Sequence, residues 1–574
     1  MEISSSVKKK IEEWEHGPYD QKTKEEISFL LKNNPHELID SFCETLNFGT
    51  GGIRAKMGVG INRLNQYTIS FATQGLANYI TSLNIKNPKV LIGFDNRHNS
   101  KFFASVAARV LAKNNIKVFL FENLRPTPLI SFGCRYKNCT AAINITASHN
   151  TKEYNGYKVF WSDGGQVLPP HDEEIIQHYS KIESINDVKI SKEDDFTNIE
   201  IIDSEIDIAY LEKLFSMELY KKEKSNGLKI IYSPLHGSGI TIIPKCLNEG
   251  GFKNVIIVKE QETIDPDFTN AKKPNPEEKE TLKFGIASLL KNNGDIFIAT
   301  DPDADRVGVV ININNSPYIF TGNEMAAIML DYICRNETLS KNSACVKSIV
   351  TTKLLNEIAK SYDIRCFEVL TGFKYIAEKI SIWESDKSLK FIFGSEESLG
   401  YLYETFVRDK DAVASSLLIA KIASEAKKNK KNLLNVLYEI YKKNGLFREA
   451  LYSFQFEASE AGLEKMNDKV EKIRSHPLKI IANFEVVKIE DFLKGKIYNI
   501  LENTKSILDL PFSNVLRYTL SDKTTITIRP SGTEPKIKVY ISVETHDIKN
   551  IEEDIKKLDE KLKSFYGIIL DILN

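Results

Sequence analysis

The segment Val90-Leu91-Ile92-Gly93-Phe94 opens the series of alternating elements that decides the fold. It is a short apolar run, which predicts a buried strand. Residues 100–113 then have helical periodicity, and the runs 118–121 and 141–145 are apolar again. Strands that alternate with helices of about 10 to 15 residues are typical of βαβ units around a mostly parallel sheet.

The same alternation recurs twice further along the chain. One set of strand-like runs comprises residues 228–232, 255–258 and 295–299, and the other comprises residues 318–320, 346–350, 367–370 and 391–393. We therefore expect three similar α/β domains with mixed sheets. The similarity between them is too faint to establish a repeat by sequence identity.

The two ends of the chain differ from this pattern. Residues 449–574 contain strand-like runs and end in an amphipathic helix at 548–565, which predicts a smaller C-terminal α+β domain. Residues 4–46 are helical in period, with breaks at Gly17-Pro18 and Asn34-Pro35. The predicted divisions are a helical extension, three α/β domains and the C-terminal domain, at residues 1–46, 47–200, 201–314, 315–447 and 448–574.

The composition is that of an enzyme-sized globular protein. The 574 residues are 42% hydrophobic, and 77 Lys and Arg balance 78 Asp and Glu. This balance argues against a nucleic-acid or membrane-surface partner selected by bulk charge. The seven cysteines lack metal-finger spacing. With no evident signal peptide or membrane-spanning run, we expect reduced thiols, a cytoplasmic location, and a monomer or homodimer.

A polar motif follows the apolar run 141–145. Thr146-Ala147-Ser148-His149-Asn150 places Ser148 at the carboxyl end of a predicted strand, where open α/β sheets carry their chemistry. A serine in that position beside a histidine is a candidate nucleophile. A turn in which Ser148 and Asn150 satisfy backbone groups explains the same residues without any chemistry.

A second motif, Thr300-Asp301-Pro302-Asp303-Ala304-Asp305-Arg306, follows another apolar run. Three carboxylates at alternating positions just past a strand end bring hard oxygen ligands to one point, which suits Mg²⁺. The alternative is a solvated acidic turn whose aspartates cap a helix. The repulsion between three such close charges favours the metal site.

Three further clusters offer groups that bind sugars or anions. Phe48-Gly49-Thr50-Gly51-Gly52-Ile53-Arg54 combines close backbone approach with a guanidinium group, or is a flexible loop. Gly394-Ser395-Glu396-Glu397-Ser398 offers acceptors to sugar hydroxyls, or is a helix N-cap with an acidic first turn. Arg529-Pro530-Ser531-Gly532-Thr533-Glu534-Pro535-Lys536 forms an anion cradle, with phosphate as the expected anion, or is a plain turn.

Taken together, these clusters describe metal-assisted phosphoryl transfer on a sugar phosphate. They also resemble, in the same order, the motifs of the α-D-phosphohexomutases, a family that includes phosphoglucomutases and phosphomannomutases. The resemblance covers roughly residues 46–545. The segments Gly93-Phe94-Asp95-Asn96-Arg97-His98-Asn99-Ser100 and Leu370-Thr371-Gly372-Phe373-Lys374 are most similar to the branch of longer phosphoglucomutases and phosphopentomutases.

The resemblance implies four domains around a central cleft, and an isomerase-class intramolecular phosphotransferase of carbohydrate metabolism. It would interconvert glucose 1-phosphate and glucose 6-phosphate through a phosphoserine and a 1,6-bisphosphate, with glucose 1,6-bisphosphate as activator. One Mg²⁺ would be held by Asp301, Asp303, Asp305 and an oxygen on Ser148. The implied catalytic residues are Ser148, His149, Lys158, Arg54 and Arg306.

The resemblance also implies a set of substrate-binding residues. Glu396 and Ser398 would contact the sugar hydroxyls, and Gly372 and Lys374 would add further contacts, although a lysine at a helix start can equally be solvated. The phosphate that is not transferred would lie against Arg529, Ser531, Gly532, Thr533 and Lys538. For Lys158 to act as a base its pKa must fall.

Three positions depart from the family pattern. Thr151 replaces a usual proline, Lys538 a frequent arginine and Ala412 a common glycine. None removes a group that the mechanism requires. A phosphopentomutase, a phosphomannomutase or a glucose-1,6-bisphosphate synthase would share every motif. A metal-dependent phosphatase and a non-catalytic paralogue are the more distant alternatives.

Overall fold

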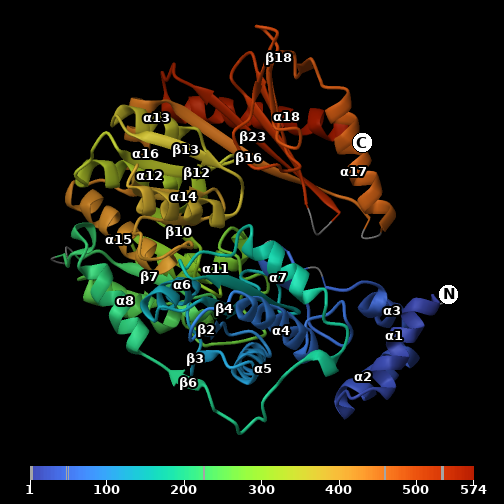
Figure 1. The fold of residues 1–574 in the computed structure, drawn as a ribbon. Coiled ribbons are helices and arrows are strands. Elements are labelled where there is room, and N and C mark those ends of the chain that lie inside the picture. The colour runs from blue at the N-terminus through green and yellow to red at the C-terminus, as the bar shows by residue number, and fades with distance from the viewer. Residues whose placement is uncertain are drawn as a thin grey trace. The chain divides into compact units, whose positions relative to one another are not determined.

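The computed structural model describes residues 4–46, 48–49, 51–223, 227–457, 460–531 and 535–573. The chain forms two compact units. Unit 1 comprises Met1–Gly322, Ala377–Asp386 and Ser398–Lys430, and unit 2 comprises Asn323–Ile376, Lys387–Glu397 and Lys431–Asn574. The fold consists of three α/β/α domains and a C-terminal domain with an antiparallel sheet, as predicted (Figure 1).

The first sheet of unit 1 is six-stranded and mixed. Its strands, in spatial order, are β1 (Gly52–Lys56), β5 (Tyr154–Trp161), β4 (Ala141–Ile145), β2 (Lys89–Phe94), β3 (Lys117–Phe121) and β6 (Ile199–Ile202). β4, β2, β3 and β6 are parallel, whereas β5 and β1 are antiparallel to their neighbours. The series that begins at Val90 therefore has the predicted βαβ order.

Helices cover both faces of this sheet because the side chains of β2 alternate in direction. Val90 and Ile92 belong to the core that contains Phe103 of α5 (Ser100–Lys113). On the other face, a Cβ added at Gly93 would lie 2.0 Å from Ile130 of α6 (Thr127–Tyr136). The other helical segments of unit 1 up to residue 249 are α4 (Gln66–Ser82), α7 (His171–Tyr179), α8 (Glu205–Phe215) and α9 (Ile243–Glu249), with 3₁₀ turns at Ile185–Asp187, Glu218–Tyr220 and Ser238–Thr241.

The predicted N-terminal helices are confirmed as α1 (Ser5–His16), α2 (Gln21–Asn33) and α3 (Pro35–Cys43). Trp14 stacks on Tyr19 with ring centroids 4.3 Å apart and meets the edge of Tyr67 in α4 at 5.3 Å. Buried Arg63 forms ion pairs with Glu37 at 2.6 Å and Asp40 at 2.5 Å. The extension is thus packed on the first domain through aromatic rings and a buried cation.

The second sheet of unit 1 has five strands, which are β11 (Ser316–Ile319), β10 (Val307–Ile313), β9 (Ile296–Thr300), β7 (Ile230–Ser233) and β8 (Val255–Ile257). The prediction that residues 318–320 belong to the third set of strands is wrong, because β11 pairs with β10 as an antiparallel hairpin of the second sheet. The remaining elements of unit 1 are α10 (Lys259–Glu262), α11 (Lys279–Lys291), α15 (Ala412–Lys428) and β15 (Gly400–Leu402).

In unit 2, β13 (Arg365–Val369), β12 (Ser343–Ser348) and β14 (Lys390–Glu396) lie side by side and parallel. β14 continues through Glu396, so the acidic cluster belongs to a strand end and its interpretation as a helix N-cap is wrong. The helices of this region are α12 (Gly322–Asn336), α13 (Leu354–Ser361), α14 (Phe373–Asp386) and α16 (Leu433–Asn444), where the first residue of α12 and the later part of α14 belong to unit 1.

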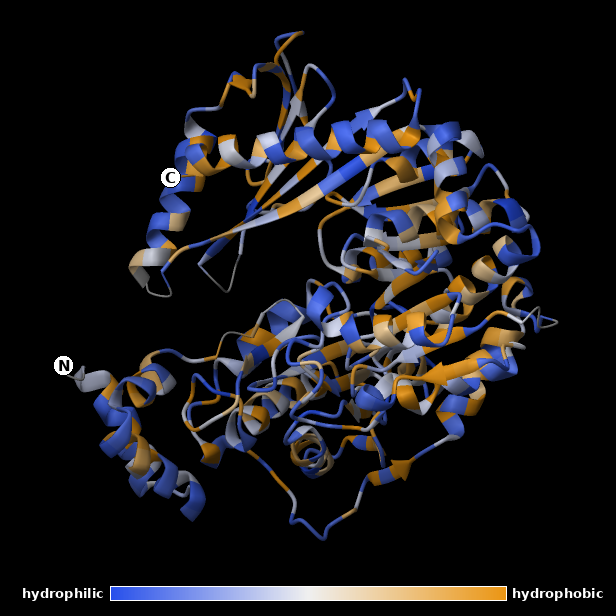
Figure 2. Ribbon diagram, turned by 180° about the vertical axis from the view of Figure 1, so that it is seen from behind, coloured by the Kyte–Doolittle hydropathy of each residue, from blue (hydrophilic) through white to orange (hydrophobic). Residues whose placement is uncertain are grey.

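The C-terminal sheet is antiparallel throughout. Its strands are β16 (Leu446–Gln455), β23 (Lys536–Thr545), β22 (Thr525–Pro530), β21 (Leu516–Leu520), β18 (Phe484–Asp491), β19 (Lys496–Asn499) and β20 (Thr504–Ile507), with β17 (Ile480–Ile481) paired to β18. α17 (Glu460–Ser475) and α18 (Ile551–Leu573) complete the domain, and α18 lies across β16 and β23 (Figure 1). Figure 2 shows hydrophobic and hydrophilic residues interspersed along α18, in keeping with its predicted amphipathic character.

Candidate active site

Ser148 lies three residues beyond the end of β4 and is buried. Its backbone φ is +51°, in the left-handed region that residues other than glycine rarely adopt. Its Oγ donates a hydrogen bond to Asp301 Oδ2 at 2.8 Å and lies 3.3 Å from His149 Nδ1. The structure therefore joins two of the predicted motifs at the ends of β4 and β9.

The three aspartates Asp301, Asp303 and Asp305 are buried, and each offers a carboxylate oxygen within 4.8 Å of the others. Asp301 Oδ1 accepts the backbone N–H groups of Asp305 at 3.1 Å and Arg306 at 3.0 Å. The turn that bends these carboxylates together also holds Ala304 at a φ of +48°. A solvated acidic turn does not describe these buried groups.

The donor set of this cluster fits a hard divalent cation. Asp303 Oδ1 and Asp305 Oδ1 are buried and accept no hydrogen bond from any residue that the structure describes. Burial, and then the charges of Asp305 and Asp303, raise the pKa of Asp301 well above its usual range. Three carboxylates with unused oxygens are ligands that Mg²⁺ prefers, and a bound cation would offset their repulsion.

Two lysines approach the same cluster. Lys158 Nζ lies 2.7 Å from Asp303 Oδ2 and 3.6 Å from Asp305 Oδ2. Lys410 Nζ lies 3.1 Å from Asp305 Oδ2 and 3.0 Å from Asp409 Oδ1. Burial alone would lower the pKa of Lys158, but Asp303 and Asp305 raise it above the usual value. The expected fall in the pKa of Lys158 is therefore absent from this arrangement, because carboxylates surround the amine.

Lys158 reaches the cluster from β5 because β1 and β5 approach closely. Gly52 pairs with Lys158, has a φ of +126°, and would bring an added Cβ within 1.9 Å of the Tyr157 carbonyl oxygen. Only glycine allows this approach. The glycine-rich segment is thus partly a strand, and the described residues 51–56 are not a flexible loop.

Three further predicted residues lie around Ser148. Arg54 in β1 donates from Nη1 to Asn150 Oδ1 at 3.0 Å. Arg306 Nη1 lies 3.6 Å from Glu277 Oε2, and its Nε lies 3.9 Å from Asp305 Oδ1. Burial, followed by the charges of Arg306 and Arg54, lowers the pKa of His149 well below its usual range. The imidazole beside Ser148 is therefore neutral.

The motifs assign no role to several residues of this cluster. Thr127 Oγ1 donates to Asp303 Oδ2 at 2.9 Å, and Gln166 Nε2 donates to Asp409 Oδ2 at 2.7 Å. Lys410 follows Asp409 in a segment that drew notice only for Ala412. The signal that could have found Lys410 is a Lys flanked by two Asp just before an apolar helix.

The predicted sugar-binding residues lie mainly in unit 2. Glu396 Oε1, at the end of β14, accepts the Gly372 N–H at 2.8 Å, so these two predicted segments meet. Lys374 is buried in the first turn of α14, and its Nζ lies 5.2 Å from the centre of the Tyr375 ring. Ser398 belongs to unit 1.

The predicted phosphate cradle lies on β22 and β23 of unit 2. Arg529 pairs with Lys538 across these strands, and the Ser531 N–H donates to the Lys536 carbonyl oxygen at 2.8 Å. Burial and the charge of Glu397 raise the pKa of Tyr540 in β23, whereas Arg529 lowers it. Tyr540 thus lies within the electrostatic reach of both predicted segments. Gly532 and Thr533 lie outside the described residues.

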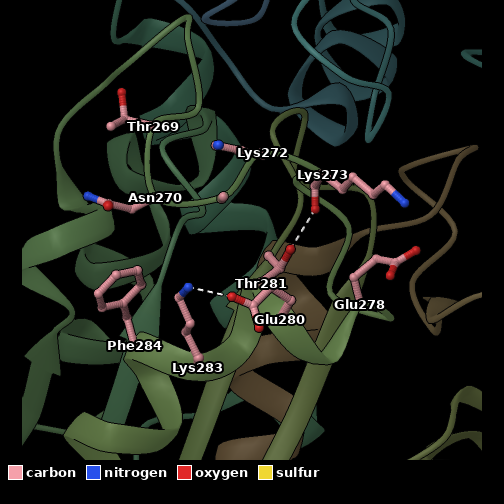
Figure 3. Close-up of a pocket in the computed structure, with 10 residues that line it drawn as sticks. Thr269, Asn270, Lys272, Lys273, Glu278, Glu280, Thr281, Lys283 and Phe284 are labelled. Atoms are coloured by element: carbon pink, nitrogen blue, oxygen red, sulfur yellow. Dashed lines mark hydrogen bonds and ion pairs between the residues drawn. The ribbon is translucent and has the colours of Figure 1, made fainter.

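Unit 1 also has a hollow of about 400 Å³ that contains none of the predicted site residues. Figure 3 shows Lys283 directed at Glu280 and the hydroxyl of Thr281 directed at the Lys273 carbonyl oxygen, to which it donates at 2.6 Å. The lining residues are Thr269, Asn270, Ala271, Lys272, Lys273, Glu278, Glu280, Thr281, Lys283 and Phe284. These contacts satisfy its polar groups internally, and nothing directs it towards Ser148.

Comparison with known families matches four models along the chain. They are the phosphoglucomutase/phosphomannomutase alpha/beta/alpha domains I, II and III and the C-terminal domain, over residues 45–186, 208–313, 321–441 and 467–558. The chain is 36% identical over 517 residues to the phosphoglucomutase of Staphylococcus haemolyticus (strain JCSC1435), a match that covers 90% of this chain and 93% of that relative.

Two solved structures share the fold. A putative phosphomannomutase from Thermus thermophilus has a TM-score of 0.68 at 19% identity, covering 92% of this chain and 99% of that one. Aspergillus fumigatus N-acetylphosphoglucosamine mutase, in complex with GlcNAc-6P and magnesium, has a TM-score of 0.50 at 12% identity, and the match covers both chains completely.

These matches, together with the buried aspartates beside Ser148, define the class of the protein. The chain belongs to the α-D-phosphohexomutase superfamily and is an isomerase-type phosphomutase, which confirms the resemblance of its motifs. Its curated relatives at 36–37% identity are named phosphoglucomutase. Among the described helices, none combines the length and apolar character needed to cross a membrane.

Proposed function

We propose that this phosphohexomutase interconverts glucose 1-phosphate and glucose 6-phosphate, and that Ser148 carries the phosphoryl group between them. The observation that supports this most strongly is the buried contact of 2.8 Å between Ser148 Oγ and Asp301 Oδ2, within the cluster of three aspartates. The identity to relatives named phosphoglucomutase supports the choice of glucose.

The proposed reaction consists of two balanced transfers. In the first, the oxygen of the free C6 hydroxyl of glucose 1-phosphate attacks the phosphorus on Ser148. The bond between phosphorus and Ser148 Oγ breaks, the hydroxyl loses its proton, and glucose 1,6-bisphosphate forms. After the sugar reverses its orientation, Ser148 Oγ attacks the C1 phosphate and loses its own proton. The C1 oxygen leaves and is protonated, which gives glucose 6-phosphate and restores the phosphoserine.

Asp301, Asp303, Asp305 and an oxygen on Ser148 would hold Mg²⁺, which supplies charge neutralisation for the transferred group. The magnesium complex of the Aspergillus fumigatus mutase supports this assignment. Arg54 and Arg306 lie close enough to His149 to lower its pKa, and we assign them to stabilising the same phosphoryl charge.

His149 and Lys158 are the proposed proton acceptors. His149 Nδ1 is 3.3 Å from Ser148 Oγ, within reach of the hydroxyl proton, and its ring is neutral. Lys158 carries a proton while Asp303 and Asp305 surround it, so it first serves as a positive charge and a proton donor. This division gives the two residues complementary roles.

Substrate recognition is assigned to the other predicted residues. Glu396 and Ser398 would accept hydrogen bonds from the sugar hydroxyls, with Gly372 and Lys374 as further contacts. The retained phosphate would be bound by Arg529, Ser531, Gly532, Thr533 and Lys538, because guanidinium, ammonium and backbone N–H groups suit a dianion. Seven free cysteines support our further proposal of a cytoplasmic location.

The test is a coupled assay for glucose 6-phosphate formed from glucose 1-phosphate, with Mg²⁺ and a trace of glucose 1,6-bisphosphate. Ser148→Ala should abolish turnover. Ser416→Ala is the matched control, because Ser416 is buried and donates to the Ala412 carbonyl oxygen within α15. It should retain activity.

Parallel reactions with ribose 1-phosphate and mannose 1-phosphate test the choice of sugar. Faster turnover of ribose 1-phosphate would reassign the enzyme as a phosphopentomutase, and faster turnover of mannose 1-phosphate as a phosphomannomutase. Steady release of inorganic phosphate would indicate a phosphatase. Activity that survives in Ser148→Ala would overturn the role of Ser148.

A further inference from the structure

Arg97 lies beneath the Ser148 segment and holds it by its backbone. Its Nη2 donates to the carbonyl oxygens of Ser148 and Asn150, each at 2.5 Å. Its Nη1 donates to the carbonyl oxygens of Thr151 at 2.8 Å and Tyr154 at 3.0 Å. One buried guanidinium group therefore joins four carbonyl groups over a stretch of seven residues.

Asp95 completes this arrangement from the other side of the segment. Its Oδ2 lies 3.1 Å from Arg97 Nε and accepts a hydrogen bond from Thr146 Oγ1 at 2.6 Å. Thr146 Oγ1 in turn accepts the Ser148 N–H at 2.8 Å. Both the N–H and the C=O of Ser148 are thus connected to the single pair Asp95–Arg97.

These contacts coincide with an unusual backbone conformation. Ser148 has a φ of +51°, which costs on the order of 1 kcal/mol for a residue other than glycine and persists only where its surroundings fix it. That conformation directs Oγ at Asp301 Oδ2. The groups that fix both peptide units of Ser148 therefore also fix the direction of its hydroxyl.

Water is kept away from the guanidinium group. The Arg97 side chain has 0% exposure, and its Cζ lies 5.0 Å from the centre of the buried Phe268 ring. The neighbouring Asn96 Nδ2 donates to the Asp265 carbonyl oxygen at 3.0 Å. Hydrogen bonds in such a dry site are stronger than in water, and a broken one would leave a buried group unsatisfied.

We propose that Arg97 is a positioning residue for phosphoryl transfer, which acts by holding the backbone of residues 148–154 so that Ser148 Oγ faces the aspartates. This inference rests on the proposed role of Ser148. Lysine cannot replace arginine here, because one ammonium group cannot span four carbonyl oxygens in a plane. At Thr151, where related sequences favour a conformationally restricted proline, the Arg97 contact supplies the restraint.

The decisive comparison is between Arg97→Lys and Arg125→Lys. Arg125 is also buried, with ion pairs of 2.8 Å to Asp203 and Asp207, but it contacts neither the serine segment nor the aspartate cluster. Arg97→Lys should lower kcat about 10²-fold while the KM for glucose 1-phosphate stays close to that of the wild type. Arg125→Lys should lower the melting temperature and leave kcat near the wild-type value.

Hydrogen exchange supplies a readout independent of activity. The backbone amides of residues 146–156 should exchange faster in Arg97→Lys than in the wild type and Arg125→Lys. The rate at which Ser148 becomes phosphorylated by glucose 1,6-bisphosphate, followed by mass spectrometry, should fall in parallel. If wild-type Ser148 accepts no phosphoryl group, the proposed function fails, yet the exchange rates still report whether Arg97 holds the segment.

Thr146→Val provides a milder second variant in case Arg97→Lys does not fold. It removes the hydroxyl that links Ser148 N–H to Asp95 while keeping the shape of the side chain. A smaller fall in kcat with faster exchange at 146–156 would support the proposal. Wild-type kcat and exchange in Thr146→Val, or losses in Arg97→Lys that match those of Arg125→Lys, would overturn it.

Discussion

Lys158 Nζ and Asp303 Oδ2 form a buried ion pair at 2.7 Å, and Asp303 is also one of the three aspartates of the candidate metal cluster. The lysine and a divalent cation would therefore draw on the same carboxylate. Since two cations at short range repel each other in a buried site, the lysine sets an upper limit on how tightly the cluster binds metal.

Replacing Lys158 by methionine should consequently have opposite effects on binding and catalysis. The affinity of the unphosphorylated protein for Mn²⁺, measured by electron paramagnetic resonance, should rise at least about tenfold. The kcat should fall by about 10²- to 10⁴-fold, because a proton-transfer group is lost. Lys421→Met is the control, since Lys421 is also buried but donates to the Lys221 carbonyl oxygen. Weaker Mn²⁺ binding in Lys158→Met would contradict this reasoning.

Magnesium should stabilise the folded protein through the aspartate cluster. At about 100 times its dissociation constant, a ligand that binds only the folded state adds about 2.7 kcal/mol. Calorimetry should therefore show a higher melting temperature in Mg²⁺ than in a chelator, and Asp305→Asn should remove this increment. Asp207→Asn should keep it, because Asp207 is paired with Arg125. An increment that persists in Asp305→Asn would place the metal elsewhere.

Glu396 should affect substrate binding through its carboxylate and through Gly372. Alanine at this position removes the acceptor of the Gly372 N–H and should raise the KM for glucose 1-phosphate by about 10- to 100-fold, the equivalent of a hydrogen bond to a charged group. Glu396→Gln keeps an oxygen at the same place and should raise KM less. Equal KM values for the two variants would show that the Gly372 contact has no role in binding.

A buried charge network in unit 2 should make stability depend on acid pH. Arg517 donates to Glu490 at 2.7 and 2.8 Å and to Glu368 at 2.9 Å. Burial alone would raise the pKa of Glu368, but Lys347 and Arg517 hold it below its usual value. Burial opposes a similar lowering of the pKa of Glu490 by Arg517.

Because both folded-state pKa values are depressed, these carboxylates contribute stability above the unfolded value of about 4.3 and lose it as the pH falls below that. Arg517→Met should cost about 3 to 5 kcal/mol at pH 7 and should flatten the fall in stability below about pH 4.3. The measurement is denaturant unfolding from pH 7 to 3. Arg365→Met is the control, since Arg365 is exposed on β13. An unchanged acid slope in Arg517→Met would exclude the network as its source.

Local sequence signals predicted the framework of the fold and the centre of the site. The apolar runs before Ser148 and Asp301 are β4 and β9, and the breaks at Gly17-Pro18 and Asn34-Pro35 separate real helices. These features are local, since periodicity and turn residues act over a few positions. The convergence of Ser148 and Asp301 followed from two strand ends of similar kind.

Other features depend on contacts between distant segments and could not be predicted in this way. The run 318–320 looks like any short strand, and only its pairing with β10 assigns it to the second sheet. Lys410 reaches Asp305 across about a hundred residues of sequence. The partners of Arg97 are mostly backbone carbonyl groups, which every residue carries and no motif records.

The N-terminal helices have a practical consequence for truncation. Similarity to the first family domain begins at residue 45, so a shortened protein could reasonably start there. That cut would remove Glu37 and Asp40, both carboxylates that neutralise the buried Arg63, and would strip Trp14 from Tyr67. The smallest autonomous form of this enzyme therefore has to include α1 to α3, and its folding boundary lies upstream of its boundary of common ancestry.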